Sequence, residues 1–153
     1  MTNSIPYADI DHMDDPETRK VVEKTYKFYP IPENNIRASH IADAHNNIEE
    51  PIKAAETFGN IDFLILNGDI PNHSGDIAYF AAIHCIAGEI TKGEYPVIFS
   101  RGNHDMRGIY AENIQDHTPT DNGRSYFSVR VGSLWALVLD CGEDKPDDHP
   151  EYG

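Results

Sequence analysis

Apolar residues gather in three short runs along the chain, and the stretches between these runs have a longer repeat. The runs cover residues 36–42, 62–67 and 95–100, and the second is apolar at consecutive positions, as in a strand covered on both faces. Residues 48–59 and 75–92 carry apolar side chains at helical spacing and end at or just before a glycine. The pattern therefore predicts two helices that alternate with three strands.

The segments after the third run predict a short helix and then a hairpin. Residues 109–116 have the character of a short helix, whereas 125–131 and 134–140 are strand-like and flank a turn at Gly132-Ser133. Parallel strands joined by helices form right-handed crossovers, so the carboxyl ends of the core strands lie along one edge of the sheet. The predicted fold class is α/β, with a βαβαβ core and a following β-hairpin.

The first part of the chain has a different composition from this core. Residues 1–20 are polar and acidic and predict a loop, and residues 21–29 alternate loosely and predict one strand. Since a lone strand is unstable, it either joins the main sheet or belongs to a neighbouring module. We therefore divide the chain into residues 1–33, a leader or the tail of a preceding module, and residues 34–153.

Side chains that bind metal ions follow each of the three core strands. Asp43 and His45 follow the first strand, Asp69 the second, and Asn103 and His104 the third. Manganese, iron and zinc all accept mixed sets of imidazole and carboxylate ligands. Two such ions about 3.5 to 4 Å apart can hold a hydroxide and clamp a phosphate in line with it. We therefore expect a site for two metal ions at this edge of the sheet.

The order of these residues suggests a role for each. Asp69 follows the middle strand in sequence and is the candidate for a bridging carboxylate, and Asn103 is placed to give an amide oxygen to the second ion. His104 is placed to donate a proton to the leaving oxygen, and we expect Asp105 to hold its tautomer. Because Asp43 and His45 are two residues apart, a turn has to let both face one ion.

Three further residues near these motifs are open to two interpretations. His73 follows Asp69 closely and is either a substrate contact or an ordinary loop residue. Arg101 and Arg107 flank the third motif. Both favour surface positions, but Arg107 is also a candidate for binding a phosphate.

The charge of the chain excludes several classes of partner. Lysine and arginine number 12 against 26 aspartate and glutamate, which gives a formal net charge of -14, so we expect neither nucleic acid nor an anionic membrane as partner. An anionic substrate would need bound cations to reverse the local field.

No apolar run approaches the ~18 residues of a membrane span. Cys85 and Cys141 form no C-x-x-C pair, which favours separate thiols in a reducing cytoplasm.

The three motifs together resemble those of the calcineurin-like metallophosphoesterase superfamily. They are Asp43-x-His45, Gly68-Asp69 and Gly102-Asn103-His104-Asp105, each after an apolar strand. The resemblance covers residues 36–140 and implies hydrolysis of phosphate mono- or diesters with two ions of manganese, iron or zinc. It also implies that Asp43 and His45 bind the first ion. Position 72 is Asn where purple acid phosphatases have a tyrosine.

The resemblance further implies a downstream His and a Gly-His-x-His motif, which the residues up to Gly153 do not contain. We therefore expect residues 34–153 to be the N-terminal part of a metallophosphoesterase domain, inactive by itself because its active site is incomplete. An uncovered sheet edge would then favour self-association. The alternative hypothesis is a non-catalytic α/β module that uses the same acids to bind metal or a partner.

Overall fold

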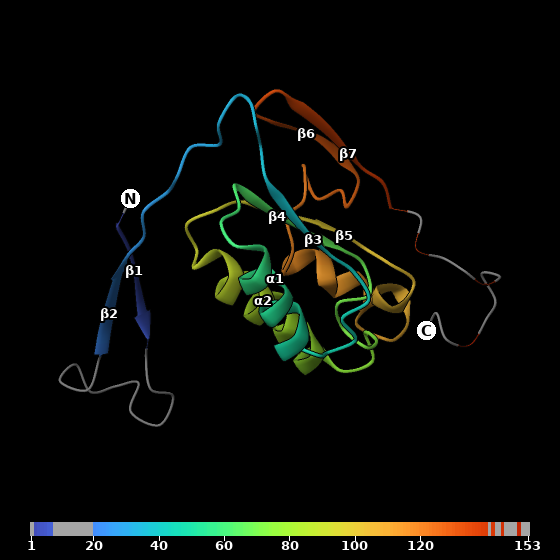
Figure 1. Ribbon diagram of the computed structural model, residues 1–153. Helices are drawn as coiled ribbons and strands as arrows, with labels where there is room; N and C mark the ends of the chain where they lie inside the picture. The colour runs from blue at the N-terminus through green and yellow to red at the C-terminus, as the bar shows by residue number, and fades with distance from the viewer. Residues whose placement is uncertain (1, 8–19, 141, 143–144, 146–149, 151–153) are drawn as a thin grey trace.

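The computed structural model describes residues 2–7, 20–140, 142, 145 and 150. Its central element is a parallel sheet with the strand order β3-β4-β5, covered by helices on one face and by a β-hairpin on the other (Figure 1). The strands are β3 (Ala38–Ile41), β4 (Phe63–Asn67) and β5 (Val97–Ser100), and the long helices are α1 (Glu49–Phe58) and α2 (Ala81–Thr91). The predicted α/β class, with its βαβαβ core and following hairpin, is confirmed.

The ends of the two helices follow from local chemistry. Gly59 ends α1 with φ of 87°, a left-handed conformation that glycine adopts without a steric penalty. Helix α2 continues directly from the 3-10 helix η2 (Ile77–Phe80), whose first turn is capped by the Asp76 carboxylate bonded to the Ala78 amide at 2.9 Å. The predicted helix 75–92 is therefore one 3-10 turn followed by an α-helix.

Strand β4 contributes side chains to two separate apolar clusters because alternate residues of a strand point to opposite faces. Leu64 and Leu66 are fully buried in the cluster beneath the helices, together with Phe99 of β5. Phe63 and Ile98 lie in the cluster on the other face. The run that is apolar at consecutive positions is thus a strand buried on both sides, as predicted.

The second cluster lies under the antiparallel hairpin of β6 (Phe127–Val131) and β7 (Leu134–Val138). The turn between these strands contains Gly132 with φ of 58°, and a Cβ atom there would lie 2.4 Å from the carbonyl oxygen of Pro32. The side chains of Trp135 and Leu137 are 73% and 70% exposed on the hairpin. The expected self-association through an uncovered edge stays a prediction.

The N-terminal segment differs from its prediction. Residues 2–7 form strand β1 (Thr2–Tyr7), which pairs in antiparallel register with β2 (Lys20–Thr25) in a sheet of their own, away from the α/β core (Figure 1). The expectation of a loop over residues 1–20 is therefore wrong for residues 2–7, because strand pairing across a long connection is not visible in local composition. The single strand predicted over residues 21–29 is β2, and its partner is β1 rather than the main sheet.

The segment after β5 contains two 3-10 helices, η3 (His104–Met106) and η4 (Ala111–Asp116). The short helix predicted over residues 109–116 corresponds to η4, which buries Ala111 and Ile114. None of the helices in the described residues has the length and apolar character needed to span a bilayer.

Replacing Leu66 by alanine should lower the free energy of unfolding by about 2 to 5 kcal/mol, because it removes buried methyl groups and leaves a cavity. Leu66 is 0% exposed, whereas Leu137, also on a strand, is 70% exposed and serves as the matched control. Leu137→Ala should change stability by less than about 0.5 kcal/mol. Urea unfolding of both variants checks this, and equal effects would contradict the assignment of Leu66 to the core.

Candidate metal centre

The loops that follow β3 and β4 are joined by backbone hydrogen bonds beyond the end of the sheet. The amide of Asp43 donates to the carbonyl of Gly68 at 3.2 Å, and the amide of His45 donates to the carbonyl of Asp69 at 3.0 Å. These bonds extend the pairing of β3 with β4 into the segments that carry the first two motifs. Candidate ligands from two motifs are therefore held side by side.

The backbone at three candidate ligands is in the left-handed region. Asp43 has φ of 55°, His45 of 47° and Asp69 of 55°, a conformation that costs energy for residues with a Cβ atom and that clusters at functional sites. The turn expected between Asp43 and His45 is present, and it brings the Asp43 carboxylate within 3.9 Å of His45 Nε2. Both side chains are accessible, at 72% and 36% respectively.

The glycines of the second and third motifs let the loops after β4 and β5 approach each other closely. A Cβ atom at Gly68 would lie 2.7 Å from the Gly102 Cα, and one at Gly102 would lie 2.3 Å from Asp69 Oδ1. Both distances are shorter than Cβ atoms tolerate. Glycine is thus required at these positions by packing between the motifs.

The buried side chain of Asp105 fixes this approach. Its Oδ2 atom accepts hydrogen bonds from the amides of Asp69 at 2.7 Å and Gly102 at 2.6 Å, and its side chain is 0% exposed. Burial raises the pKa of Asp105 to about 7, although the amide hydrogen bonds from Gly102 and Asp69 act to lower it. Asp69 Oδ1 in turn accepts from the amide of His104 at 2.8 Å.

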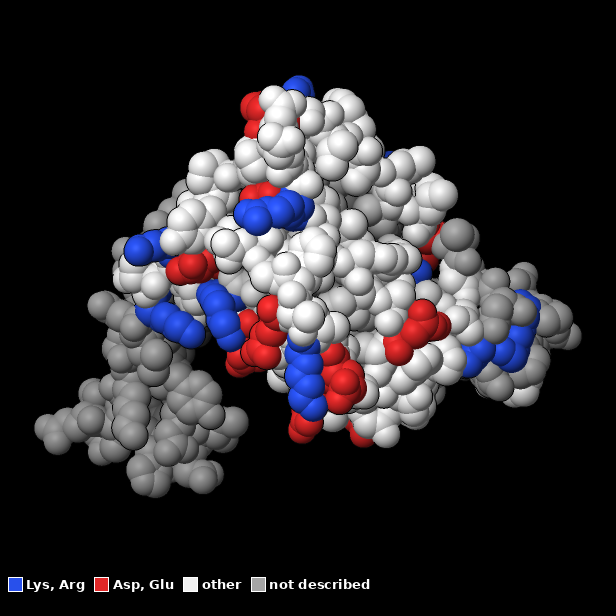
Figure 2. Space-filling model, in the orientation of Figure 1, with Lys and Arg blue, Asp and Glu red and all other residues white. Residues whose placement is uncertain are grey.

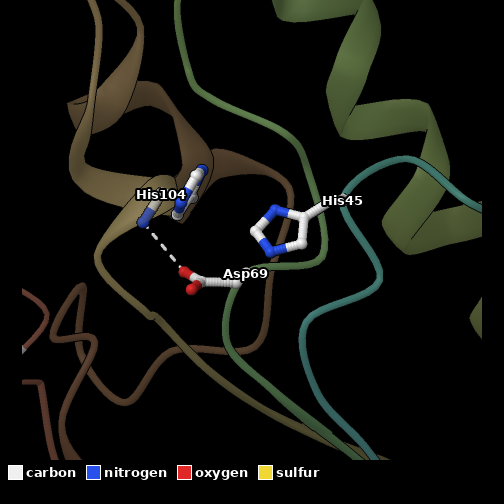
Figure 3. Close-up of side chains that lie close together, drawn as sticks. All are labelled: His45, Asp69 and His104. Carbon is white, nitrogen blue, oxygen red and sulfur yellow. Dashed lines mark hydrogen bonds between the residues drawn. The ribbon is translucent and has the colours of Figure 1, made fainter.

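Three of the predicted site residues form a close group at this edge of the sheet. One potential ligand atom from each of His45, Asp69 and His104 lies within 4.8 Å of the other two (Figure 3). Donor atoms that bind one ion at about 2.1 Å are at most about 4.2 Å apart, so small side-chain adjustments suffice. Imidazole and carboxylate donors suit a divalent transition metal. The His45 imidazole and the Asp69 carboxylate therefore fit a metal ion, whereas both ring nitrogens of His104 contact other groups.

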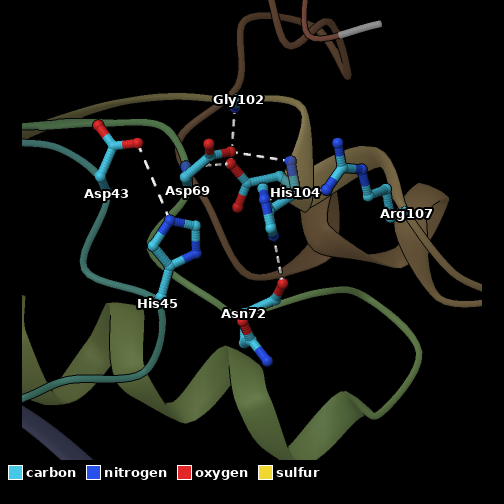
Figure 4. Close-up of polar contacts among 8 residues, drawn as sticks. Asp43, His45, Asp69, Asn72, Gly102, His104 and Arg107 are labelled. Atoms are coloured by element: carbon cyan, nitrogen blue, oxygen red, sulfur yellow. Dashed lines mark hydrogen bonds and ion pairs between the residues drawn. The ribbon is translucent and has the colours of Figure 1, made fainter. Parts of the chain in front are cut away.

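Hydrogen bonds to both ring nitrogens define the tautomer of His104. Nδ1 lies 2.6 Å from the carbonyl oxygen of Asn72, and Nε2 lies 2.9 Å from Nη1 of Arg107 (Figure 4). A carbonyl only accepts and a guanidinium only donates, so the ring is neutral and carries its hydrogen on Nδ1.

Asp105 does not have the contact that we expected. The Asn72 carbonyl, rather than Asp105, binds the Nδ1 atom of His104, and the Asp105 carboxylate is engaged with backbone amides. The reason is the fold of η3, which buries Asp105 while His104 stays partly exposed. Asn72 contacts His104 through its backbone carbonyl, and no sequence pattern predicts such a contact.

The remaining predicted residues surround the close group. Asp43 is next to His45, as described, and is not a member of the group. Asn103 precedes η3 as its N-cap residue and is partly buried. His73 and Arg107 line one pocket together with His104.

The side chain of Arg101 is buried, so its predicted surface location is wrong. Its side chain is 8% exposed and forms a two-pronged ion pair with Asp140, which also accepts a hydrogen bond from Ser125. The pair links the third motif to the segment just after β7. Asp140 was not among the predicted site residues, although an acid at the end of an apolar strand is the same signal that marked the other motifs.

A parallel sheet that gathers imidazole and carboxylate donors at the carboxyl ends of its strands defines a metal-binding α/β protein. The chain belongs to the calcineurin-like phosphoesterase family, because the family model matches residues 36–147. The resemblance drawn from the three motifs is thereby confirmed. No curated protein matches the chain.

Replacing Gly102 by alanine should weaken manganese binding by at least about tenfold, because the new methyl group displaces the Asp69 carboxylate. Gly88→Ala is the matched control, since a Cβ atom at this helical glycine meets nothing within 4 Å. Calorimetric titration with manganese measures the affinities, and circular dichroism checks that both variants fold. Unchanged affinity in a folded Gly102→Ala protein would contradict the packing argument.

The Arg101–Asp140 pair should make the free energy of unfolding depend on pH in the acid range. Burial alone would raise the pKa of Asp140, but hydrogen bonds from Arg101 and Ser125 and the charge of Arg101 outweigh it and lower the pKa. The resulting stabilisation is complete above the ordinary aspartate pKa of about 3.9 and is lost as the pH falls through the lower value of the folded state.

Asp140→Asn should therefore lower the free energy of unfolding at pH 7 by about 3 kcal/mol, because it leaves Arg101 buried without a carboxylate. The difference from the unmodified protein should narrow below about pH 4. Urea unfolding between pH 7 and pH 2.5 measures it, with the exposed Asp121→Asn as control. A difference that stays constant with pH would refute the linkage.

Proposed function

We propose that this protein hydrolyses phosphate monoesters or diesters in a reaction that depends on two bound metal ions of manganese, iron or zinc. The close group of His45, Asp69 and His104 at the strand ends, in a member of the phosphoesterase family, is the observation that carries this proposal. Bound divalent ions would supply positive charge that acidifies a water molecule and neutralises the phosphate.

We assign the ligands by their positions around the close group. Asp43 and His45 would hold the first ion, since their side chains lie 3.9 Å apart on one turn. Asp69 would lie between the ions, and Asn103, which precedes η3, would contribute to the second. The left-handed backbone at Asp43, His45 and Asp69 supports a functional rather than a purely structural role for these residues.

His104 would donate a proton to the leaving oxygen of the ester. In the ring as the structure has it Nε2 accepts from Arg107 and carries no hydrogen, so it would first take up a proton from solvent. Because Nδ1 stays bonded to the Asn72 carbonyl, the proton that leaves the ring would be the one on Nε2. After the transfer the ring is neutral with its hydrogen on Nδ1, which is the tautomer that the contacts of Asn72 and Arg107 define. The surroundings of His104 thus stabilise the form of the ring that follows proton donation.

The net charge of the protein agrees with a role for metal ions in binding an anionic substrate. The formal charge of -14 opposes phosphate binding in general. Over the helical layer, acidic and basic side chains lie next to each other (Figure 2). On α1, Lys53 pairs with Glu49 and Glu50. Local positive charge at the site therefore has to come from bound cations and from the arginine near His104.

Asp69→Asn should lower manganese affinity by more than about 100-fold and abolish hydrolysis of an aryl phosphate, because a neutral amide replaces the central carboxylate. Asp116→Asn is the matched control at an exposed position. Calorimetry with manganese and a chromogenic phosphatase assay give the two readouts, both measured on a longer form of the protein that carries the downstream His and Gly-His-x-His motifs.

The two readouts separate the proposal from its alternative. Manganese-dependent turnover that is lost in Asp69→Asn and kept in Asp116→Asn supports the hydrolase. Tight manganese binding without turnover of any ester would favour a non-catalytic metal-binding module instead. Turnover that persists in Asp69→Asn would refute the assignment of the site.

A further inference from the structure

A pocket of about 390 Å³ opens beside His104 and has His73 and Arg107 in its lining. Its lining residues are Asn72, His73, Gly75, His104, Arg107 and Gly108, and none of them is acidic. In a protein with a net charge of -14, a pocket with an arginine and no carboxylate among its described lining residues is suited to an anionic group.

The contacts of His73 leave it with a donor for this pocket. Its Nδ1 atom accepts the amide hydrogen of Gly75 at 3.0 Å, and its ring packs edge-on against Tyr79 at 4.8 Å between centroids. The neutral ring therefore carries its hydrogen on Nε2. His73 and Arg107 are thus two donors in the same pocket.

The position of Arg107 relative to His104 determines how far a second anionic group can lie from the leaving oxygen. Arg107 Nη1 lies 2.9 Å from His104 Nε2, the atom from which the leaving oxygen would take its proton. A leaving oxygen bonded to Nε2 at a usual hydrogen-bond distance would therefore lie within roughly 6 Å of Nη1. An acidic group two or three atoms from the leaving oxygen spans this gap.

We propose that Arg107, assisted by His73, makes the site selective for phosphate esters whose leaving group carries a second anionic group, a carboxylate or a phosphate, close to the scissile oxygen. This inference rests on the proposed function. In the reaction, the bond between phosphorus and the leaving oxygen breaks, water supplies the new oxygen on phosphorus, and the leaving oxygen takes the proton from His104. Binding of the second anionic group draws Arg107 away from Nε2, which then takes up a proton from solvent and passes it to the leaving oxygen.

The test compares three esters whose leaving groups share a two-carbon chain, with manganese present. 2-Hydroxyethyl phosphate has a neutral leaving group, 2-phosphoglycolate a carboxylate, and ethane-1,2-diyl bisphosphate a second phosphate. Charge-assisted hydrogen bonds from Arg107 should raise kcat/KM for one or both anionic esters at least about tenfold over the neutral one. The two anionic esters distinguish a carboxylate from a phosphate as the preferred group.

Variants of the arginine assign the preference to its side chain. Arg107→Met should reduce the ratio of kcat/KM for the anionic ester to kcat/KM for the neutral ester to about one. Arg107→Lys should restore part of this ratio, because the charge returns without the planar guanidinium. Arg130→Met, which alters an exposed arginine on β6, should leave the ratio unchanged. A ratio near one in the unmodified protein, or one that survives Arg107→Met, would overturn the inference.

A binding measurement separates this inference from the proposed function. 3-Phosphonopropionate and 3-hydroxypropylphosphonate are non-hydrolysable isosteres of the anionic and neutral esters, and calorimetry with the manganese-loaded protein gives their affinities. Tighter binding of 3-phosphonopropionate that is lost in Arg107→Met supports the inference even where no ester is turned over. Absence of turnover in a form that carries the downstream histidine motifs would refute only the proposed hydrolase. Equal affinities, or no binding of either phosphonate, would overturn the inference whatever the turnover.

Discussion

Reciprocal hydrogen bonds between two aspartates and the backbone hold the candidate site together. Asp105, in the segment after β5, accepts from the amide of Asp69, and Asp69, after β4, accepts from the amide of His104. Each loop thus supplies a carboxylate that satisfies an amide of the other. Asp105 Oδ1 is buried without a hydrogen-bond partner in the described part of the chain, which is costly. The arrangement therefore depends on the packed core that keeps both loops in place.

All three layers of the fold contribute to this constraint. The helices cover one face of the sheet and fix the strands whose ends carry the ligands, and the β6–β7 hairpin covers the other face. The Arg101–Asp140 ion pair then connects the third motif to the segment after β7, and a Cβ atom at Gly142 would lie 2.5 Å from the Gly102 carbonyl oxygen. The geometry of a site at one sheet edge is thus set partly by a hairpin that contributes none of the candidate ligands.

His104 belongs both to the close group of candidate ligands, with His45 and Asp69, and to the pocket that contains Arg107. The Asn72 carbonyl fixes one nitrogen of its ring and the Arg107 guanidinium occupies the other. Because both ring nitrogens are hydrogen-bonded, the His104 side chain is held in one orientation and one tautomer. A fixed orientation is what proton transfer at one defined atom requires.

The sequence alone determined the α/β class, the order of its core elements and the edge at which the candidate ligands gather. These follow from hydrophobic period and from the rule that parallel strands end on one side. The glycines at positions 68 and 102 marked the motifs, but only the tertiary structure gave the reason, since their contact joins residues 34 positions apart. Tertiary structure also decided that Arg101 is buried against Asp140, that Asn72 rather than Asp105 orients His104, and that residues 2–7 form a strand. Each of these depends on a partner distant in the chain, and local pattern contains no information about such partners.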